Sequence, residues 1–308
     1  MMRVVPLLAA LVFCLSGLVG VASAQQTLTV CLEEDSPPLS FKFRSRQGGF
    51  DHGVAEEVAR RLDMGFAVQW FEAENDEENV PVWEANALLS DGLCDVVGGY
   101  PLVASSLGKP ETDQGAIPEY DGMKRSERGR LVKLGVLAAT DPYNRVSFGV
   151  FLGPVLKDLQ VTGLHDLEGR RIGYEVETMA SVLVHRYRGG VLIPTAVSMR
   201  QSEGVLPALA DGELDAAVLE VHKFDNFMRR NADAPIHFSG YVHPLGINMG
   251  FAILERDADL ASRINAALTA MKSDGTLEKL AQKWQMTFIK PQPPKVLKRI
   301  TPAMLAGE

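Results

Sequence analysis

Acidic side chains are the most prominent candidates for chemistry in this sequence. Four carboxylates alternate like the early ligands of a calcium-binding loop, namely Glu72, Glu74, Asp76 and Glu78. The run lacks the glycine on which such a loop turns, and Trp83 stands at the twelfth position, where the loop needs glutamate. Carboxylates before and within a helix that starts near Pro81 also favour its positive end. We therefore expect no metal site.

Enzymatic motifs are mostly absent. The chain has no Gly-x-Ser-x-Gly, no phosphate-binding glycine loop and no His-Glu-x-x-His, and its six histidines lack the spacing of metal ligands. Its 308 residues carry a formal net charge of −8 without a cluster of lysine and arginine, which argues against a nucleic-acid partner. We expect no catalytic residue and no cofactor.

Eight other side chains could hold a small ligand if the fold brings them into one cleft. They supply three carboxylates, three aromatic rings, one guanidinium and one hydroxyl. The predicted ligand-binding residues are Glu33, Glu34, Phe41, Tyr100, Tyr143, Arg145, Thr178 and Glu220. Core packing is the alternative role for each aromatic ring, and an ion pair between two halves of the fold is the alternative for the arginine.

Two similar stretches, SDGLCDVVGGY (90–100) and ADGELDAAVLE (210–220), indicate how these residues are positioned. In each, an amphipathic run precedes Asp-Gly and an apolar run follows the second aspartate. Gly92 and Gly212 stand where a helix ends in a left-handed residue. The apolar runs are typical of strands buried on both faces of a sheet. Each stretch therefore predicts a helix-to-strand turn.

The same order of elements precedes each turn. The first half predicts strands over 27–32 and 66–71 around a helix over 53–62. The second half repeats this order of strand, helix and strand over 170–175, 178–187 and 191–197. Each half is thus expected to form an α/β lobe with right-handed parallel crossovers.

Two further apolar stretches, 141–153 and 247–257, are expected to be hinge strands, and two closing helical patterns would cover the first lobe. We predict an α/β clamshell of two lobes, with its cleft at the strand ends where open α/β sheets bind ligands. The predicted boundaries are 25–147 plus 250–289 for the first lobe, 148–249 for the second lobe and 290–308 for a C-terminal tail.

Two segments do not follow the lobe pattern. Residues 103–135 form a long, polar connection, which is typical of a functional or mobile loop. Residues 290–308 are rich in proline and basic, so we expect an extended arm that stays outside the core.

The N-terminus has the pattern of a secretory signal peptide over residues 1–24. Arg3 is followed by an apolar run and by the small residues Ala22-Ser23-Ala24, which predicts cleavage near Ala24. The alternative is a lipoprotein signal at Cys14, but Phe13 is too bulky for the position before a lipidated cysteine. No later stretch reaches the roughly 18 apolar residues of a membrane span. We predict a periplasmic protein without a transmembrane span in the mature chain.

Export would leave two cysteines, Cys31 and Cys94, in an oxidising compartment. We predict a disulfide between them, which would close a loop of 63 residues. The alternative is that both are small buried apolar residues on neighbouring strands.

Several segments together resemble the family 3 extracellular solute-binding proteins of the type II periplasmic binding fold, over residues 26–288. They are LTVCLEEDSPPLSF, GFDHGVAEEVARRL, LLSDGLCDVVGGYP, DPYNRVSFGVF, LHDLEGRRIGYEVETMAS, ALADGELDAAVLE and LTAMKSDGTLEKLAQKW. The resemblance implies that an arginine after CDVVGG holds the carboxylate of an amino-acid ligand, while an acid at the end of AAVLE holds its ammonium. This chain offers only Lys109 for the first role and has Glu177 where the family usually has glycine, but Glu220 could hold a cation.

Three segments, VCLEEDSPPLSF, LCDVVGGYP and PYNRVSFGVF, also look like the accessory binding proteins of PQQ-dependent methanol and alcohol dehydrogenases, the MxaJ and XoxJ type. Asn144 and Phe148-Gly149 depart from that pattern. The resemblance implies a quinoprotein dehydrogenase or its cytochrome c as partner.

Three functions follow from these resemblances. The leading prediction is an accessory protein of a quinoprotein dehydrogenase. The alternative is a substrate-binding protein that serves an ABC permease and carries a small polar or cationic solute. The third is an enzyme of the cyclohexadienyl dehydratase kind, in which Glu33 or Glu220 would be the general acid.

Overall fold

A computed structural model describes residues 25–73 and 81–307. Its main feature is a nine-stranded mixed sheet, in which β9 (Leu137–Ala139) pairs with β14 beside the main path. Along that path the strands are β12 (Ala196–Met199), β11 (Ile172–Glu175), β13 (Ala216–Glu220), β10 (Asn144–Leu152), β14 (His237–Leu254), β6 (Val96–Pro101), β1 (Thr27–Glu33) and β5 (Gly65–Phe71). The expected α/β class is confirmed.

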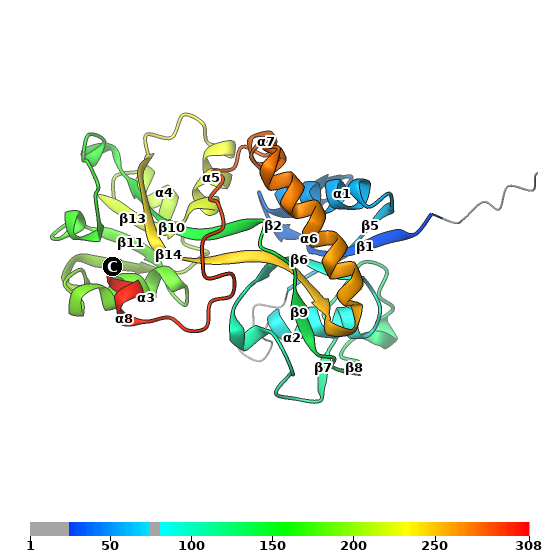
Figure 1. The fold of residues 1–308 in the computed structure, drawn as a ribbon. Helices are drawn as coiled ribbons and strands as arrows, with labels where there is room; N and C mark the ends of the chain where they lie inside the picture. Colours follow the sequence, from blue (N-terminus) through cyan, green and yellow to red (C-terminus); the bar gives the residue numbers. More distant parts are fainter. Residues whose placement is uncertain (1–24, 74–80, 308) are drawn as a thin grey trace, which may run out of the picture.

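The two ends of the sheet are parallel, and its middle is antiparallel. β1 pairs in parallel with β5 and β6, and β11 pairs in parallel with β12 and β13. The long strands β10 and β14 pair with each other and run between the two groups of elements (Figure 1). The predicted boundaries at 147 and 249 remain a proposal about how the two groups would move.

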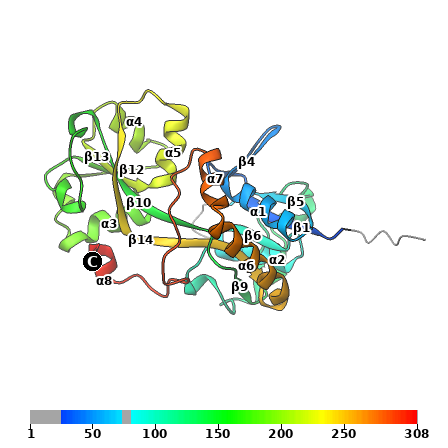
Figure 2. The ribbon, with the colours of Figure 1, turned by 45° about the horizontal axis from the view of Figure 1, so that its top comes forward.

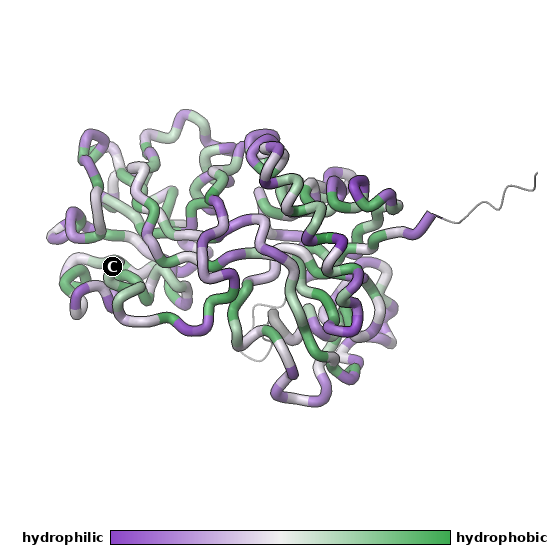
Figure 3. The backbone as a smooth tube through the Cα atoms, viewed as in Figure 1, coloured by the Kyte–Doolittle hydropathy of each residue, from purple (hydrophilic) through white to green (hydrophobic). Residues whose placement is uncertain are grey.

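Helices cover each group separately, as Figures 1 and 2 show. Those of the first group are α1 (Phe50–Arg61), α2 (Pro81–Ser90), α6 (Ala258–Ser273) and α7 (Thr276–Lys283). Those of the second group are α3 (Met179–Arg186), α4 (Val205–Ala210), α5 (Val221–Arg230) and the C-terminal α8 (Pro302–Ala306). Hydrophilic residues concentrate in the peripheral loops (Figure 3).

Alternation along β1 explains why both faces of the sheet are covered. Leu28, Val30 and Leu32 belong to the core beneath α1 and α6, whereas Cys31 belongs to the core beneath α2. Because successive side chains of a strand point to opposite faces, the buried apolar residues of this strand require a layer of helix on each side.

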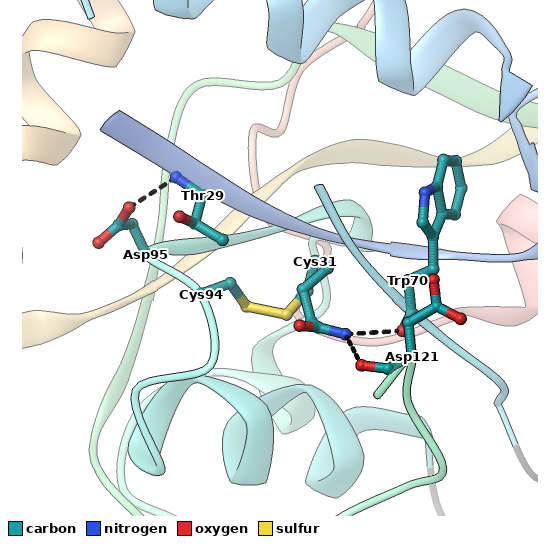
Figure 4. The surroundings of a disulfide bond; sticks show 7 residues. Thr29, Cys31, Trp70, Cys94, Asp95 and Asp121 are labelled. Carbon is teal, nitrogen blue, oxygen red and sulfur yellow. Dashed lines mark hydrogen bonds between the residues drawn. A yellow bond between two sulfur atoms is a disulfide. The ribbon is translucent and has the colours of Figure 1, made fainter. Parts of the chain in front are cut away.

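The repeated turn has the same structural role in both groups. The carboxylate of Asp95 accepts a hydrogen bond from Thr29 N at 2.7 Å, and Asp215 accepts one from Arg171 N at 2.9 Å. In return, the N–H groups of Asp95 and Asp215 donate to the carbonyls of Thr29 and Arg171. Each turn thus aligns the start of one strand with the start of its parallel neighbour (Figure 4 shows the first).

The predicted disulfide is confirmed. The sulfur atoms of Cys31 and Cys94 are bonded, and their Cα atoms are 5.6 Å apart (Figure 4). The bond joins β1 to the residue two before β6, inside the core beneath α2.

Two strands differ from their predictions. The strand predicted over 191–197 begins only at Ala196, because Ile193–Thr195 forms a 3₁₀ turn around a proline that has no N–H to donate. The second hinge strand, β14, starts at His237, ten residues before 247. Its early part pairs with β10, whose apolar run extends to Leu152.

The connection over 103–135 is not a structureless loop. It contains the hairpin of β7 (Gln114–Ala116) and β8 (Leu131–Lys133). Ile117 and Leu134 are buried in the core beneath α2. The sequence pattern missed this subdomain because its apolar residues are few and widely spaced.

The C-terminal tail has no helix over residues 290–301, ends in α8 and is docked against both groups of elements (Figure 1). Leu297 is 9% exposed and donates its N–H to Leu102 O at 2.8 Å. Farther along, Met304 and Leu305 of α8 pack against the core of the second group. The tail therefore spans the hinge strands instead of remaining apart from the core.

Candidate functional site

The carboxyl ends of β1 and β5 carry a group of acids that we call the strand-end acid cluster. Its members are Glu33, Glu34, Asp35, Glu72 and Asp121. Glu34 N donates to Phe71 O at 3.0 Å, which ties the residue after β1 to the end of β5. The neighbouring hairpin of β2 (Asp35–Ser36), β3 (Ser40–Phe43) and β4 (Arg46–Gly48) supplies a cation, Lys42, which forms an ion pair with Asp121.

Electrostatics within this cluster disfavour ionisation. Burial raises the pKa of Glu33, and the charge of Asp35 raises it further. Burial likewise raises the pKa of Glu34, with a further contribution from Glu72. Burial is the larger cause for both groups; repulsion from neighbouring carboxylates adds to it, and at Glu34 the charge of Lys42 opposes it. A cation bound near these groups would relieve that repulsion.

A buried carboxyl, Asp51, lies near Glu33 in the first turn of α1. Its side chain is 3% exposed and hydrogen-bonds to Tyr143, whose hydroxyl oxygen accepts from Gly99 N at 2.7 Å. Burial raises the pKa of Asp51 to about 7, which the Tyr143 hydrogen bond opposes and the charge of Glu33 reinforces. Gly99 is required here, because a Cβ would lie 2.8 Å from Asp51 Oδ2 and its φ is +65°.

We expect this carboxyl to make stability depend on pH. Its folded-state pKa lies above the ordinary aspartate value of 3.8, so the folded state holds the extra proton. Its contribution is therefore complete below pH 4 and is lost as the pH rises through about 7. For one proton, the free energy of unfolding changes by at most about 1.4 kcal/mol per pH unit. Urea unfolding between pH 4.5 and 8 should show a flatter dependence for Asp51→Asn than for wild type.

The exposed Asp259→Asn variant provides the control for that experiment. It should follow the wild-type pH profile. An Asp51→Asn profile that is as steep as that of wild type would contradict the assignment.

In the second group, the ends of β11 and β13 carry a cluster with charges of both signs. Lys223 Nζ forms an ion pair with Glu175, whose side chain is buried, and lies 3.6 Å from Glu220 Oε2. His222 Nε2 is 3.8 Å from the same carboxylate, and burial lowers the pKa of that histidine. Glu220, predicted to hold a ligand cation, therefore already faces a cation of the protein.

A cavity of about 230 Å³ adjoins this charge cluster. Glu175 and Lys223 line it, together with Arg230 of α5 and residues of α4. It is thus a polar cavity with charges of both signs.

The other predicted ligand-binding residues are distributed differently from the prediction. Tyr100 is 3% exposed, and its hydroxyl donates to Ser106 O at 2.6 Å, so it is a core residue. Burial raises its pKa to about 12. Tyr143 is fully buried against Phe251 and Phe50. Both rings therefore pack in the core, which was the alternative role given for each aromatic residue.

Thr178 and Phe41 occupy boundary positions. Thr178 is the N-cap of α3; its Oγ1 accepts from Ser181 N and donates to Glu175 O at 2.7 Å. Phe41 is half-buried between Trp284, in edge-to-face contact, and the Arg229 guanidinium, 5.8 Å from the ring centre. Since Arg229 belongs to α5, Phe41 lies where the two groups of elements meet.

Arg145 does not reach either set of strand ends. It is 8% exposed, and its guanidinium donates to Pro244 O and to Asn248 Oδ1, both on β14. It lies beneath the tail. The alternative role, an ion pair between the two lobes, is not observed either, because the groups that accept from Arg145 are neutral.

Several residues of these clusters were not predicted from the sequence. Asp51, Glu175 and Lys223 lie on or beside helices and strands that were predicted from the sequence. A charged residue next to the end of such an element was the signal that could have identified them. Asp121 gave no such signal, because it approaches β5 from within the long connection.

Within residues 25–73 and 81–307, no group of three or more histidine, cysteine, aspartate or glutamate side chains is arranged to hold a metal ion. The predicted metal-like run at Glu74, Asp76 and Glu78 lies outside this range. The helices of the same range are too short or too polar to cross a membrane. The predicted signal peptide also lies outside the described residues.

The open mixed sheet, with helices on both faces and two long connecting strands, is the fold of the type II periplasmic binding proteins. The L-cystine solute receptor of Neisseria gonorrhoeae, in its unliganded open conformation, has a TM-score of 0.60, 16% identity and coverage of 87% of this chain and 96% of its own. The probable amino-acid ABC transporter extracellular-binding protein ytmK from Bacillus subtilis has a TM-score of 0.57, 18% identity and coverage of 85% and 98%. An ancestral cationic amino acid solute binding protein has a TM-score of 0.55, 20% identity and coverage of 84% and 95%.

Sequence comparison gives shorter matches, and no family model matches the chain. ABC transporter arginine-binding protein 1 of Escherichia coli (strain K12) is 25% identical over 121 residues, 39% of this chain and 49% of its own. The arginine-binding extracellular protein ArtP of Bacillus subtilis is 29% identical over 136 residues, 42% and 49%. The histidine-binding periplasmic protein of Salmonella typhimurium is 28% identical over 134 residues, 41% and 50%. The chain thus spans about half the length of these curated relatives.

Proposed function

We propose that this protein is a periplasmic substrate-binding protein that delivers a small cationic, amino-acid-like solute to an ABC permease. The strand-end acid cluster carries the proposal. Within the described residues, the five carboxylates of the cluster have one cation as ion-pair partner, Lys42. Burial and, to a lesser extent, repulsion between the carboxylates raise the pKa values of Glu33 and Glu34. A ligand ammonium or guanidinium would replace the missing counter-charge.

The curated relatives support the same ligand class. Their names describe binding proteins for arginine and histidine, both of which can carry a positive side chain. A periplasmic location agrees with the histidine-binding relatives and with the predicted signal peptide. We propose that the two groups of elements close about β10 and β14, with the ligand selecting the closed state by its greater affinity for it.

The two other functions predicted from the sequence have weaker support. None of the relatives named above is described as an accessory protein of a quinoprotein dehydrogenase, and none of them is described as an enzyme. An importer component is therefore favoured over the accessory protein, and binding is favoured over catalysis. Glu33 remains our candidate for cation contact and not for proton transfer.

Calorimetric titration with L-arginine tests this function. The mature chain is expected to bind L-arginine and to bind L-glutamine more weakly, because glutamine lacks the second cation. Glu33→Gln and Glu34→Gln should each weaken arginine binding about tenfold, which corresponds to about 1.4 kcal/mol for one lost charge contact. L-histidine, L-lysine and L-glutamate would complete the panel.

Glu56→Gln is the matched control, since Glu56 is an exposed acid on the outer surface of α1. Its affinity should equal that of wild type. The proposal fails if no cationic amino acid binds, or if the Glu33→Gln, Glu34→Gln double variant retains wild-type affinity.

A further inference from the structure

A second cavity lies between the hinge strands and the C-terminal tail, away from the strand-end acid cluster. Its volume is about 140 Å³. Its lining consists of one cation and nine uncharged residues, Arg145, Pro244, Leu245, Gly246, Asn248, Gln292, Pro293, Pro294, Leu297 and Met304. A small ion or molecule of a few heavy atoms would fit this volume.

The cation in this cavity lacks a counter-charge. Within the part of the chain that the structure describes, no carboxylate lies within the 4.0 Å ion-pair limit of the Arg145 guanidinium. Its two hydrogen bonds go to neutral acceptors, Pro244 O at 2.9 Å and Asn248 Oδ1 at 3.3 Å. Asp141, an acid near the tail, is already paired with Lys295 at 2.8 Å. A buried charge that has only neutral partners is costly, so an anion that entered the cavity would be stabilised.

The backbone of β14 packs closely against Arg145. Gly246 lines the cavity, and a Cβ at this position would lie 2.7 Å from Arg145 Nε and 2.3 Å from Ser147 Oγ. Ser147 is 2% exposed, and its hydroxyl has no hydrogen-bond partner among the residues that the structure describes. The guanidinium and the Ser147 hydroxyl thus flank the same glycine. Of these two groups, the guanidinium lines the cavity and can donate to an oxyanion there.

The tail forms the outer wall of the cavity and is fixed in place. The Asn248 side-chain amide donates to the carbonyls of Gln292, Pro294 and Lys295 at 2.7 to 3.2 Å, and its oxygen accepts from Gln292 N at 3.1 Å. Because Asn248 is fully engaged in this way, Arg145 is the side chain available to bind a ligand.

We propose that this cavity binds a small oxyanion, such as inorganic phosphate or a short carboxylate, with the Arg145 guanidinium as its receptor. The planar guanidinium presents paired N–H donors that match two oxygens of either anion. Bound between β10, β14 and the tail, the anion would join the hinge strands to the tail. This inference does not depend on the proposed function, since the solute would bind elsewhere.

Thermal unfolding of the mature chain in phosphate, sulfate and acetate tests the proposal, with sodium chloride at matched ionic strength as reference. We expect a saturable rise in Tm of about 5 °C when one of these anions reaches a hundredfold excess over its Kd. Arg145→Gln should abolish that rise. Comparison of the three anions identifies whether the natural ligand is tetrahedral or a carboxylate.

Two further variants keep the experiment decisive. Met304→Trp fills the cavity and leaves Arg145 in place, so it should remove the response even if Arg145→Gln fails to fold. Arg171→Gln removes an exposed arginine that is paired with Asp215, and its anion response should match that of wild type. The proposal is wrong if no anion acts beyond chloride, or if Met304→Trp responds as wild type does.

Discussion

Replacing both Cys31 and Cys94 by alanine is expected to lower the free energy of unfolding by about 4 kcal/mol. The disulfide closes a loop of 63 residues. In the chain-entropy model, a cross-link of that span stabilises the protein by restricting the unfolded state. Alanine is apolar, as the buried environment of both cysteines requires, so the loss of the cross-link should dominate the change. Tm should fall by roughly 10 °C.

Urea denaturation measures this effect and tests its cause. The oxidised wild type should unfold with a smaller m-value than the double variant, because a cross-linked unfolded chain exposes less surface. Wild type treated with reductant under unfolding conditions should match the double variant in both midpoint and m-value. If the midpoint of the double variant equals that of the oxidised wild type, the disulfide has no stabilising role.

Much of the fold could be predicted from the sequence because its signals are local. Continuous apolar runs such as AAVLE (216–220) indicate buried strands, and Gly92 and Gly212 mark the helix ends that precede them. Two copies of one turn then predict two similar lobes. The comparison with solved structures confirms the resulting α/β fold of the type II periplasmic binding proteins.

The hairpin within 103–135 and the docked tail could not be predicted in this way. Leu297 and Met304 lie in short apolar stretches, VL (296–297) and AMLA (303–306), among prolines and charges, and no periodicity marks them as buried. Their partners on α3, β14 and the end of β6 are distant in sequence. Such contacts depend on the three-dimensional arrangement, which a local pattern does not contain.

The site was harder to predict than the fold, because side-chain direction decides which residues are accessible. Tyr100 lies at a predicted strand end, yet its ring points into the core beneath α2. Arg145 stands at the start of a predicted hinge strand, but on the face that the tail covers. A one-residue step along a strand changes the face, so only the register could separate these outcomes.

Asn248→Ala is expected to detach the tail and to lower the free energy of unfolding by about 3 kcal/mol. Asn248 is 3% exposed, and its amide donates to three carbonyls of the tail. Alanine would leave those acceptors and the N–H of Gln292 without their partner, and each unsatisfied buried group costs about 1–3 kcal/mol unless water replaces it. Urea unfolding gives the stability change, and hydrogen exchange over residues 290–306 reports detachment directly.

Two companion variants separate the role of the donors from that of side-chain volume. Asn248→Asp preserves the shape and the acceptor but removes the amide donors, so it should also release the tail. Asn231→Ala removes an exposed amide that donates to Phe227 O of the preceding helix, and it should change stability by less than about 0.5 kcal/mol. Trypsin should cleave after Lys298 and Arg299 faster in both Asn248 variants than in Asn231→Ala. Equal cleavage rates in all three would falsify the claim that Asn248 holds the tail against the hinge strands.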